Sequence, residues 1–148
     1  MTLKSLAVSA ALLSVTIAPA MAASLRGCDS YETNAAFLAF PAAETTAEYS
    51  DGRVRLITLD TAGEPACCSF HLMVLYPSAD GSYSECALIS SGTDMGYYSI
   101  LVAQAKVVRD DETGLSLIVP TEGNVEGAAV ADEIQFDVDL VAGTLSVK

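Results

Sequence analysis

Apolar and polar residues alternate along much of the chain after residue 22, with the two-residue period of a strand that buries one face. The clearest stretch covers residues 133–140. Its apolar positions are Ile134, Phe136, Val138 and Leu140, and its polar positions are Glu133, Gln135, Asp137 and Asp139. A turn at 141–143 then returns the chain through Leu145 and Val147. The pattern predicts a hairpin with one face buried and one face in water.

Residues 65–77 form the densest apolar run of this part of the chain and contain its only histidine, His71. Read as a strand, residues 68–76 are largely apolar on both faces, which predicts a central strand covered on two sides. The sequence Pro-Ser-Ala-Asp-Gly at 77–81 is a turn, and 83–90 is predicted as the next strand.

The remaining segments also favour strands. Residues 53–60 follow an Asp-Gly turn and are predicted as a strand, and 35–40 as a short strand, with a helical turn as the alternative. Residues 42–50 are predicted as a surface segment with room for one helical turn. The apolar residues of 97–108 fit the period of a helix as well as that of a strand. The turn at 110–114 and the apolar run at 115–119 favour two antiparallel strands. Residues 121–132 are predicted as a mobile loop.

These runs add up to about eight strands, which predicts an all-β fold: a single small antiparallel β-sandwich or barrel, with at most one short helix. Residues 1–22 have a positively charged start, a short apolar run and an Ala-Met-Ala cleavage pattern, as in a secretory signal peptide. We therefore expect one β-rich domain at 23–148 in the periplasm or outside the cell. An uncleaved anchor is the alternative. Lipid attachment at Cys28 is disfavoured, because Arg26 lies where the sequence motif of lipid-modified cysteines has a small residue.

Four cysteines in an exported chain predict two disulfides, made from Cys28, Cys67, Cys68 and Cys86. The predicted hairpin sets Leu72 opposite Cys86, which leaves Cys68 roughly 13 Å along the strand, too far for a bridge. Two alternatives remain. In the first, which we favour, Cys67 and Cys68 form separate disulfides with Cys28 and Cys86. In the second, Cys28 pairs with Cys86, and Cys67 and Cys68 either form a disulfide between adjacent residues or stay reduced. Redox and metal pairs are usually spaced C-x-x-C, so structural bridges are favoured.

The chain is strongly acidic, with 19 Asp and Glu against 7 Lys and Arg and a formal net charge of −12. Such a charge repels nucleic acid and anionic membranes and attracts basic partners. The alternative is a general adaptation of exported proteins, with no cationic partner. Tyr97 and Tyr98 are predicted as an exposed aromatic contact patch, with strand-capping tyrosines as the alternative.

No catalytic motif is present, and the residues identify no family. The hypothesis we favour is a non-enzymatic binding module with an acidic β surface, including Asp137 and Asp139, that binds a basic protein or peptide. The second is an envelope hydrolase using His71, although a structural histidine is the simpler interpretation. The third is a calcium-stabilised domain using Glu133, Asp137 and Asp139, which lack the usual loop pattern. No other cofactor and no oligomeric state are predicted.

Overall fold

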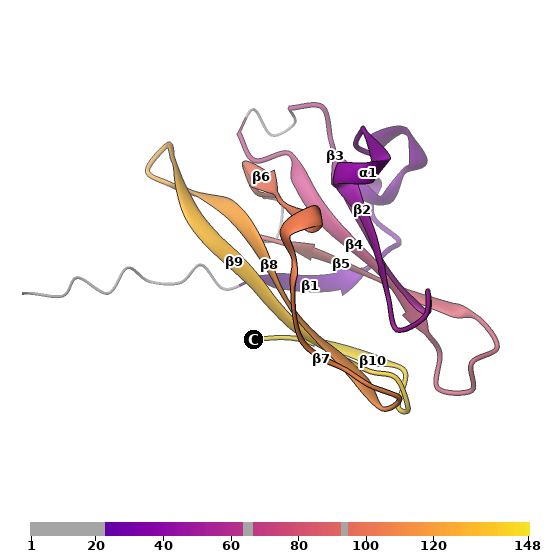
Figure 1. Cartoon of the computed structure of the whole chain (residues 1–148). Helices are drawn as coiled ribbons and strands as arrows, with labels where there is room; N and C mark the ends of the chain where they lie inside the picture. The colour runs from indigo at the N-terminus through magenta and orange to yellow at the C-terminus, as the bar shows by residue number, and fades with distance from the viewer. Residues whose placement is uncertain (1–22, 64–66, 93–94) are drawn as a thin grey trace, which may run out of the picture.

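Two antiparallel five-stranded sheets pack face to face in the computed structural model, which describes residues 23–63, 67–92 and 95–148 (Figure 1). The first sheet has the order β1-β5-β4-β3-β2. Its strands are β1 (Ser24–Gly27), β5 (Ser84–Ser90), β4 (Phe70–Pro77), β3 (Val54–Asp60) and β2 (Thr46–Tyr49). The expected signal peptide at 1–22 lies outside the described residues.

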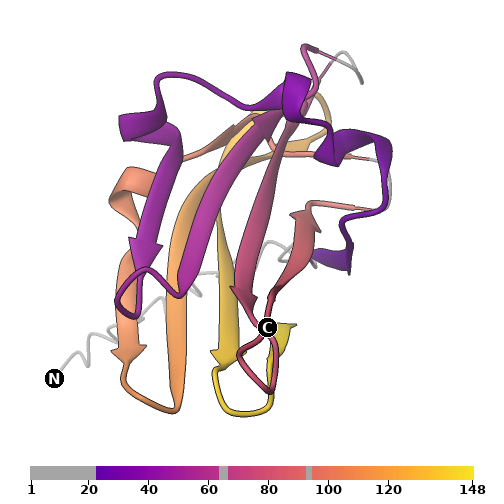
Figure 2. The same cartoon turned by 90° about the vertical axis from the view of Figure 1, so that its right-hand side faces the viewer.

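The second sheet has the order β10-β9-β8-β6, and β7 also pairs with β8. Its strands are β10 (Thr144–Val147), β9 (Ala128–Asp139), β8 (Gly114–Val125), β6 (Ser99–Ile100) and β7 (Lys106–Asp110). Figure 2 looks onto the first sheet, with the second behind it. The fold is therefore the all-β, antiparallel sandwich that the alternation predicted.

One hydrophobic core lies between the sheets and takes alternate residues from the strands of both. The first sheet contributes Val54, Leu56, Leu72, Val74 and Ile89, and the second Leu115, Leu117, Val119, Ile134, Phe136 and Val138. The hairpin predicted from residue 133 is confirmed, since Leu145 pairs with Val138 and the apolar positions of β9 face this core.

The outer face of the first sheet is also covered over part of its area, by the N-terminal segment that follows β1 (Figure 2). This segment contains η1 (Tyr31–Thr33), η2 (Ala35–Phe37) and α1 (Ala42–Thr45). It is tied to the sheet by the Cys28–Cys86 disulfide and by a bridge between Leu38 and Leu59. As a result the first part of β4 is buried on both sides, with His71 1% and Leu72 0% exposed. The outer-face residues Met73 and Leu75 further along are half-buried, so the prediction of a strand covered on two sides is confirmed only for that first part.

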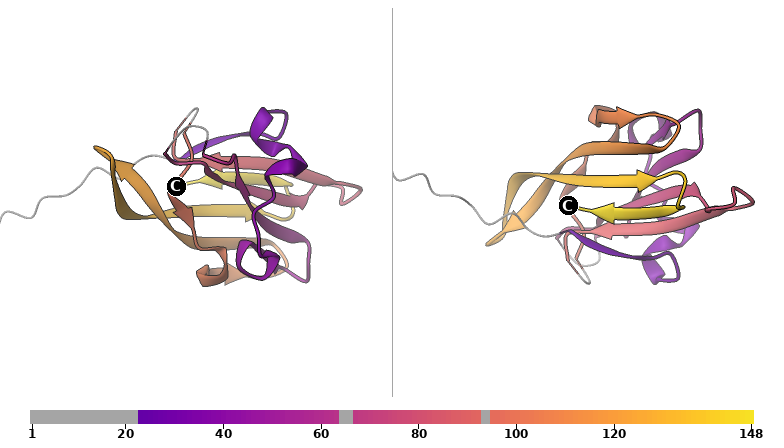
Figure 3. Two further views of the ribbon diagram at one scale, coloured as in Figure 1. Left: turned by 90° about the horizontal axis from the view of Figure 1, so that it is seen from above. Right: turned by 90° about the horizontal axis from the view of Figure 1, so that it is seen from below.

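The prediction of a mobile loop at 121–132 is wrong. Strands β8 and β9 stay paired without a break from Gly114–Asp139 to Val125–Ala128, and their hairpin extends beyond the other strands (Figure 3). Glu126 and Gly127 form its turn with φ of 52° and 87°, the positive values that suit the twist of a two-residue hairpin. The segment was missed because its glycine, alanine and glutamate residues are weak strand formers.

Three other local predictions needed correction. Residues 35–37 form the 3-10 turn η2 rather than a strand, because the Asn34 side chain accepts a hydrogen bond from the Ala36 N–H at 2.9 Å. The 97–108 segment is extended in β6 and β7 but is interrupted by the 3-10 turn η3 (Val102–Gln104). Strands β1 and β2 were not predicted; each is a four-residue edge strand.

The disulfides are Cys28–Cys86, with a Cα–Cα distance of 5.7 Å, and Cys67–Cys68. The favoured pairing is therefore wrong, and the alternative with an adjacent bridge is right. The turn between β4 and β5 is closed by a hydrogen bond from the Ser78 N–H to the Tyr83 carbonyl, so Leu75 rather than Leu72 lies opposite Cys86. Cys67 and Cys68 lie beyond the other end of β4, out of reach of Cys86.

Candidate functional site

Four hairpin turns lie together at one end of the sandwich, the lower end in Figure 2, which we call the turn end. They join β2 to β3, β4 to β5, β7 to β8 and β9 to β10. Within these turns, aspartates accept backbone hydrogen bonds. Asp80 accepts from Ser82 N at 3.0 Å, Asp111 from Thr113 N at 2.8 Å and Asp139 from Ala142 N at 2.8 Å. Each carboxylate therefore stabilises its own turn.

These hydrogen bonds lower the pKa of the turn aspartates, so the carboxylates stay ionised to a lower pH than usual. The backbone and side chain of Ser82, with Ser78, lower the pKa of Asp80 to about 2. Hydrogen bonds from Thr113 lower the pKa of Asp111, and those from Ala142 and Val141 lower the pKa of Asp139. The turn end consequently carries fixed negative charge at neutral pH.

An acidic cleft of about 290 Å³ lies between the β2–β3 and β7–β8 turns. It is lined by Ser50, Asp51, Arg53, Asp110, Asp111 and Glu112. Asp110 accepts hydrogen bonds from Ser50 N at 3.2 Å and from Ser50 Oγ at 2.6 Å, which join the two sheets at this point. The Asp51 and Glu112 carboxylates have no hydrogen-bond or ion-pair partner within the described part of the chain, so they are the free acceptors of this cleft.

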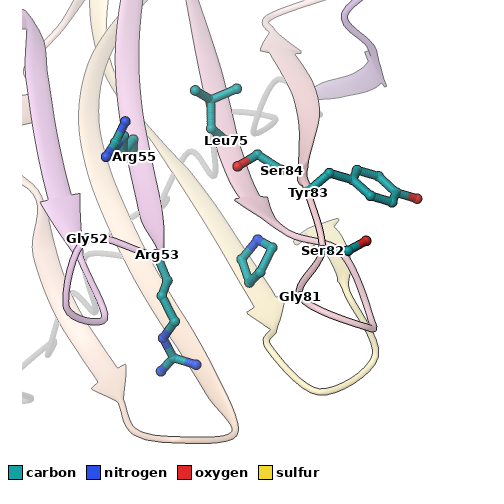
Figure 4. A pocket seen from close by; sticks show the side chains of 9 residues that line it. Gly52, Arg53, Arg55, Leu75, Gly81, Ser82, Tyr83 and Ser84 are labelled. Atoms are coloured by element: carbon teal, nitrogen blue, oxygen red, sulfur yellow. The ribbon is translucent and has the colours of Figure 1, made fainter.

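A second cleft, of about 320 Å³, adjoins the first and is defined by Arg53 and Arg55 (Figure 4). We call it the arginine cleft. Its other lining residues come from the turn before β3 and from the β4–β5 hairpin: Gly52, Leu75, Pro77, Gly81, Ser82, Tyr83 and Ser84. Figure 4 shows the two arginines on the β3 side and Leu75 and Ser84 on the opposite side. Arg53 lines both clefts.

His71 is part of a buried polar cluster under the N-terminal segment. Its Nδ1 lies 2.7 Å from Ser90 Oγ, Arg26 donates to Ser90 Oγ at 3.4 Å, and Arg26 pairs with Glu32 at 3.0 Å. Burial lowers the pKa of His71, so the imidazole is neutral at neutral pH. Its Nε2 is buried and unpartnered within the described structure. The His71 side chain is 1% exposed and lines neither of the two clefts described above.

The predicted carboxylate stripe is not gathered into a metal site. Asp137 pairs with Lys148 at 2.8 Å, Asp139 stabilises the β9–β10 turn, and Glu133 accepts a hydrogen bond from Gln135. Among the residues that the structure describes, no group of three or more His, Cys, Asp or Glu side chains is placed to hold a metal ion. The calcium hypothesis therefore finds no preformed site in the described ranges.

The aromatic patch predicted at Tyr97 and Tyr98 needs correction, because Tyr97 is 1% exposed and belongs to the core. The Phe70–Tyr97 bridge places it on the inner face of the first sheet. Tyr98 is half-buried, and its hydroxyl donates to the Gly127 carbonyl at 3.1 Å. The aromatic pair therefore does not form a contact surface.

Sequence reasoning missed the lining residues Asp51, Arg53, Arg55 and Glu112. The available signal was the Asp-Gly turn directly before two arginines spaced by two residues, in a chain with few basic residues. Comparison with protein-family models, with curated proteins and with solved structures finds no match for this chain. Within the described residues, no helix has the length and apolar character needed to span a membrane.

Proposed function

We propose that this protein is a non-enzymatic binding module that acts outside the cytoplasm, in the periplasm or after secretion, and that its turn end binds a basic side chain of a protein or peptide. The observation that carries the proposal is the acidic cleft, where the unpaired carboxylates of Asp51 and Glu112 flank a space of about 290 Å³. A lysine or arginine side chain supplies the donors that both carboxylates lack.

The electrostatics of the whole chain support the same partner. A net charge of −12 attracts a basic partner at long range and repels nucleic acid and anionic lipid. The turn aspartates add charge that is held at fixed positions, because the backbone orients them. Steering by the whole molecule and a preformed cleft act together, which favours fast and salt-sensitive binding.

The sequence supports action outside the cytoplasm. Residues 1–22 have the pattern of a cleaved secretory signal, and the four cysteines form two disulfides, which persist in oxidising compartments. Detection of a mature chain beginning near Ala23 in a periplasmic or culture fraction tests this part directly.

Binding is tested by calorimetric titration with acetyl-(Gly-Lys)₃-amide at about 20 mM and about 200 mM NaCl. The Debye length falls several-fold between these two salt concentrations. We expect the affinity to fall steeply with salt. The variant Asp51→Asn/Glu112→Gln removes both free carboxylates while leaving the turn-stabilising aspartates in place. We expect it to weaken binding about 5-fold or more at low salt, as loss of exposed ion pairs implies.

The matched control is Glu44→Gln/Glu126→Gln, which makes the same change in net charge at sites in α1 and at the β8–β9 turn, away from the turn end. It should retain the wild-type affinity. Equal weakening in both double variants would show that only net charge matters, and salt-independent binding would contradict the proposal.

A further inference from the structure

Basic residues are scarce in this chain, yet two of them line one cleft. Only 7 of 148 residues are lysine or arginine. Arg53 and Arg55 are two residues apart at the start of β3, and both contribute to the arginine cleft. A local concentration of positive charge in a molecule of net charge −12 creates a place where an anion is attracted although the whole molecule repels it.

Both guanidinium groups keep unused hydrogen-bond donors. Arg53 Nε donates to the Ser50 carbonyl at 3.1 Å, and Arg55 Nε pairs with Glu48 Oε1 at 3.0 Å. Each guanidinium carries five N–H donors, and the terminal amino groups of both have no partner in the described part of the chain. The side chains of Arg55 and Glu48 are 55% and 62% exposed. An ion pair this exposed contributes little to stability, so little is lost when Arg55 also binds a ligand.

The remaining walls of the arginine cleft suit a short organic acid group. Leu75 and Pro77 give an apolar surface for the methylene stem of an acidic side chain, and Ser84 adds a hydroxyl group to the lining. The Ser82 hydroxyl donates to Asp80 at 2.7 Å. Arginine side chains bind carboxylate and phosphate alike, so the choice between them rests on the apolar surface of Leu75 and Pro77, which matches the methylene stem of a glutamate side chain. Carboxylate is therefore the anion that this cleft favours.

We propose that the arginine cleft is an anion subsite that binds a carboxylate of the partner, so that the turn end recognises a peptide segment bearing a cationic and a carboxylate group close together. The two clefts adjoin and share Arg53. This inference rests on the function proposed for the acidic cleft, and it adds that the partner is dipolar rather than simply cationic.

The test uses three sets of peptides of the form acetyl-X-(Gly)n-Z-amide with a short spacer of varied length. The X and Z residues are lysine and glutamate, lysine and glutamine, or glutamine and glutamate. At low salt we expect the best lysine–glutamate peptide to bind about 5-fold more tightly than its lysine–glutamine counterpart, the upper range for an exposed ion pair. The variant Arg55→Gln should abolish this difference, because Arg55 lines only the arginine cleft.

The matched control is Lys106→Gln, which removes one positive charge from an exposed strand away from both clefts and should retain the glutamate preference. Equal binding of the glutamate and glutamine peptides at every spacing would overturn the anion subsite while leaving the acidic cleft intact. Loss of the lysine dependence, together with no effect of Asp51→Asn/Glu112→Gln, would instead overturn the proposed function. Tighter binding of a phosphoserine peptide than of the glutamate peptide would overturn the assignment to carboxylate.

Discussion

At the scale of single residues, Gly96 is a position where the surrounding backbone leaves no room for a side chain. Its N–H donates to the Cys68 carbonyl at 2.7 Å, and the next residue, Tyr97, pairs with Phe70. A Cβ at position 96 would collide with the carbonyl oxygens of Cys68 and Phe70 and would lie 2.9 Å from the Phe70 nitrogen. All three are backbone atoms, so no side chain can rotate away to relieve the contact.

We therefore expect Gly96→Ala to reduce the free energy of unfolding by about 3 kcal/mol, the upper range for overpacking, measured by urea denaturation. Gly92→Ala is the matched control in the same loop, because its Cβ would meet only the Met95 Cβ at 3.8 Å. That control should change stability by less than about 1 kcal/mol. Similar losses in both variants would show that the close approach at Gly96 is relieved by movement of the chain.

At the scale of elements, the two disulfides differ in what they constrain. Cys28–Cys86 joins residues 58 apart and fixes the N-terminal segment to β5, whereas Cys67–Cys68 joins neighbours and closes no loop of chain. The chain-entropy estimate for the longer loop is roughly 4 kcal/mol. Replacing both cysteines of the first bridge with alanine should cost about that much. The same change at the second bridge should cost much less, and equal losses in thermal or urea unfolding would contradict this loop argument.

The elements also show what sequence reasoning could recover. Strands β3, β4 and β5, and β9 from residue 133 onward, were predicted because each buries alternate or nearly continuous apolar residues. The edge strands β1 and β2 were missed because pairing with distant segments, rather than their own composition, holds them extended. A register error of three residues at the β4–β5 turn hid both the disulfide pairing and the contact between His71 and Ser90.

The clefts were harder to predict than the strands. The acidic cleft forms where turns from the two sheets meet, and the arginine cleft needs the β4–β5 hairpin beside β3. Their lining residues are distant in sequence, and no local pattern specifies how the sheets stack. The total charge could be read from composition, but its division into adjoining regions of opposite sign could not.

At the scale of the whole molecule, stability should depend on pH through the buried cluster beneath the N-terminal segment. Burial lowers the pKa of His71 from its ordinary value of 6.5, while the facing charges are Glu32, Arg26 and Asp60. Burial of Glu32 acts to raise its pKa, but hydrogen bonds, including one from Arg26, and the Arg26 charge outweigh it and bring the pKa to about 2. Both groups are therefore harder to protonate in the folded chain than in the unfolded chain.

For both groups the unfolded chain binds protons first, so their contribution to stability is present at high pH and is lost as the pH falls. The loss from His71 begins near pH 6.5, and the loss from Glu32 begins near pH 4.5 and continues toward pH 2. The turn aspartates, with an ordinary value of 3.8, contribute only at still lower pH. Between pH 6.5 and 4.5, His71 is therefore the shifted group, among the described residues, that controls stability.

We expect the free energy of unfolding to fall by at most about 1.4 kcal/mol per pH unit in that window, the slope for one proton, measured by urea denaturation at a series of pH values. His71→Gln is the informative variant, because its amide can still hydrogen-bond to Ser90 but does not titrate. It should flatten the curve between pH 6.5 and 4.5 while leaving the steeper loss below pH 4.5 unchanged. An unchanged curve in this variant would contradict the argument, because it would mean that His71 binds its proton equally well in the folded and unfolded chains and that burial does not lower its pKa.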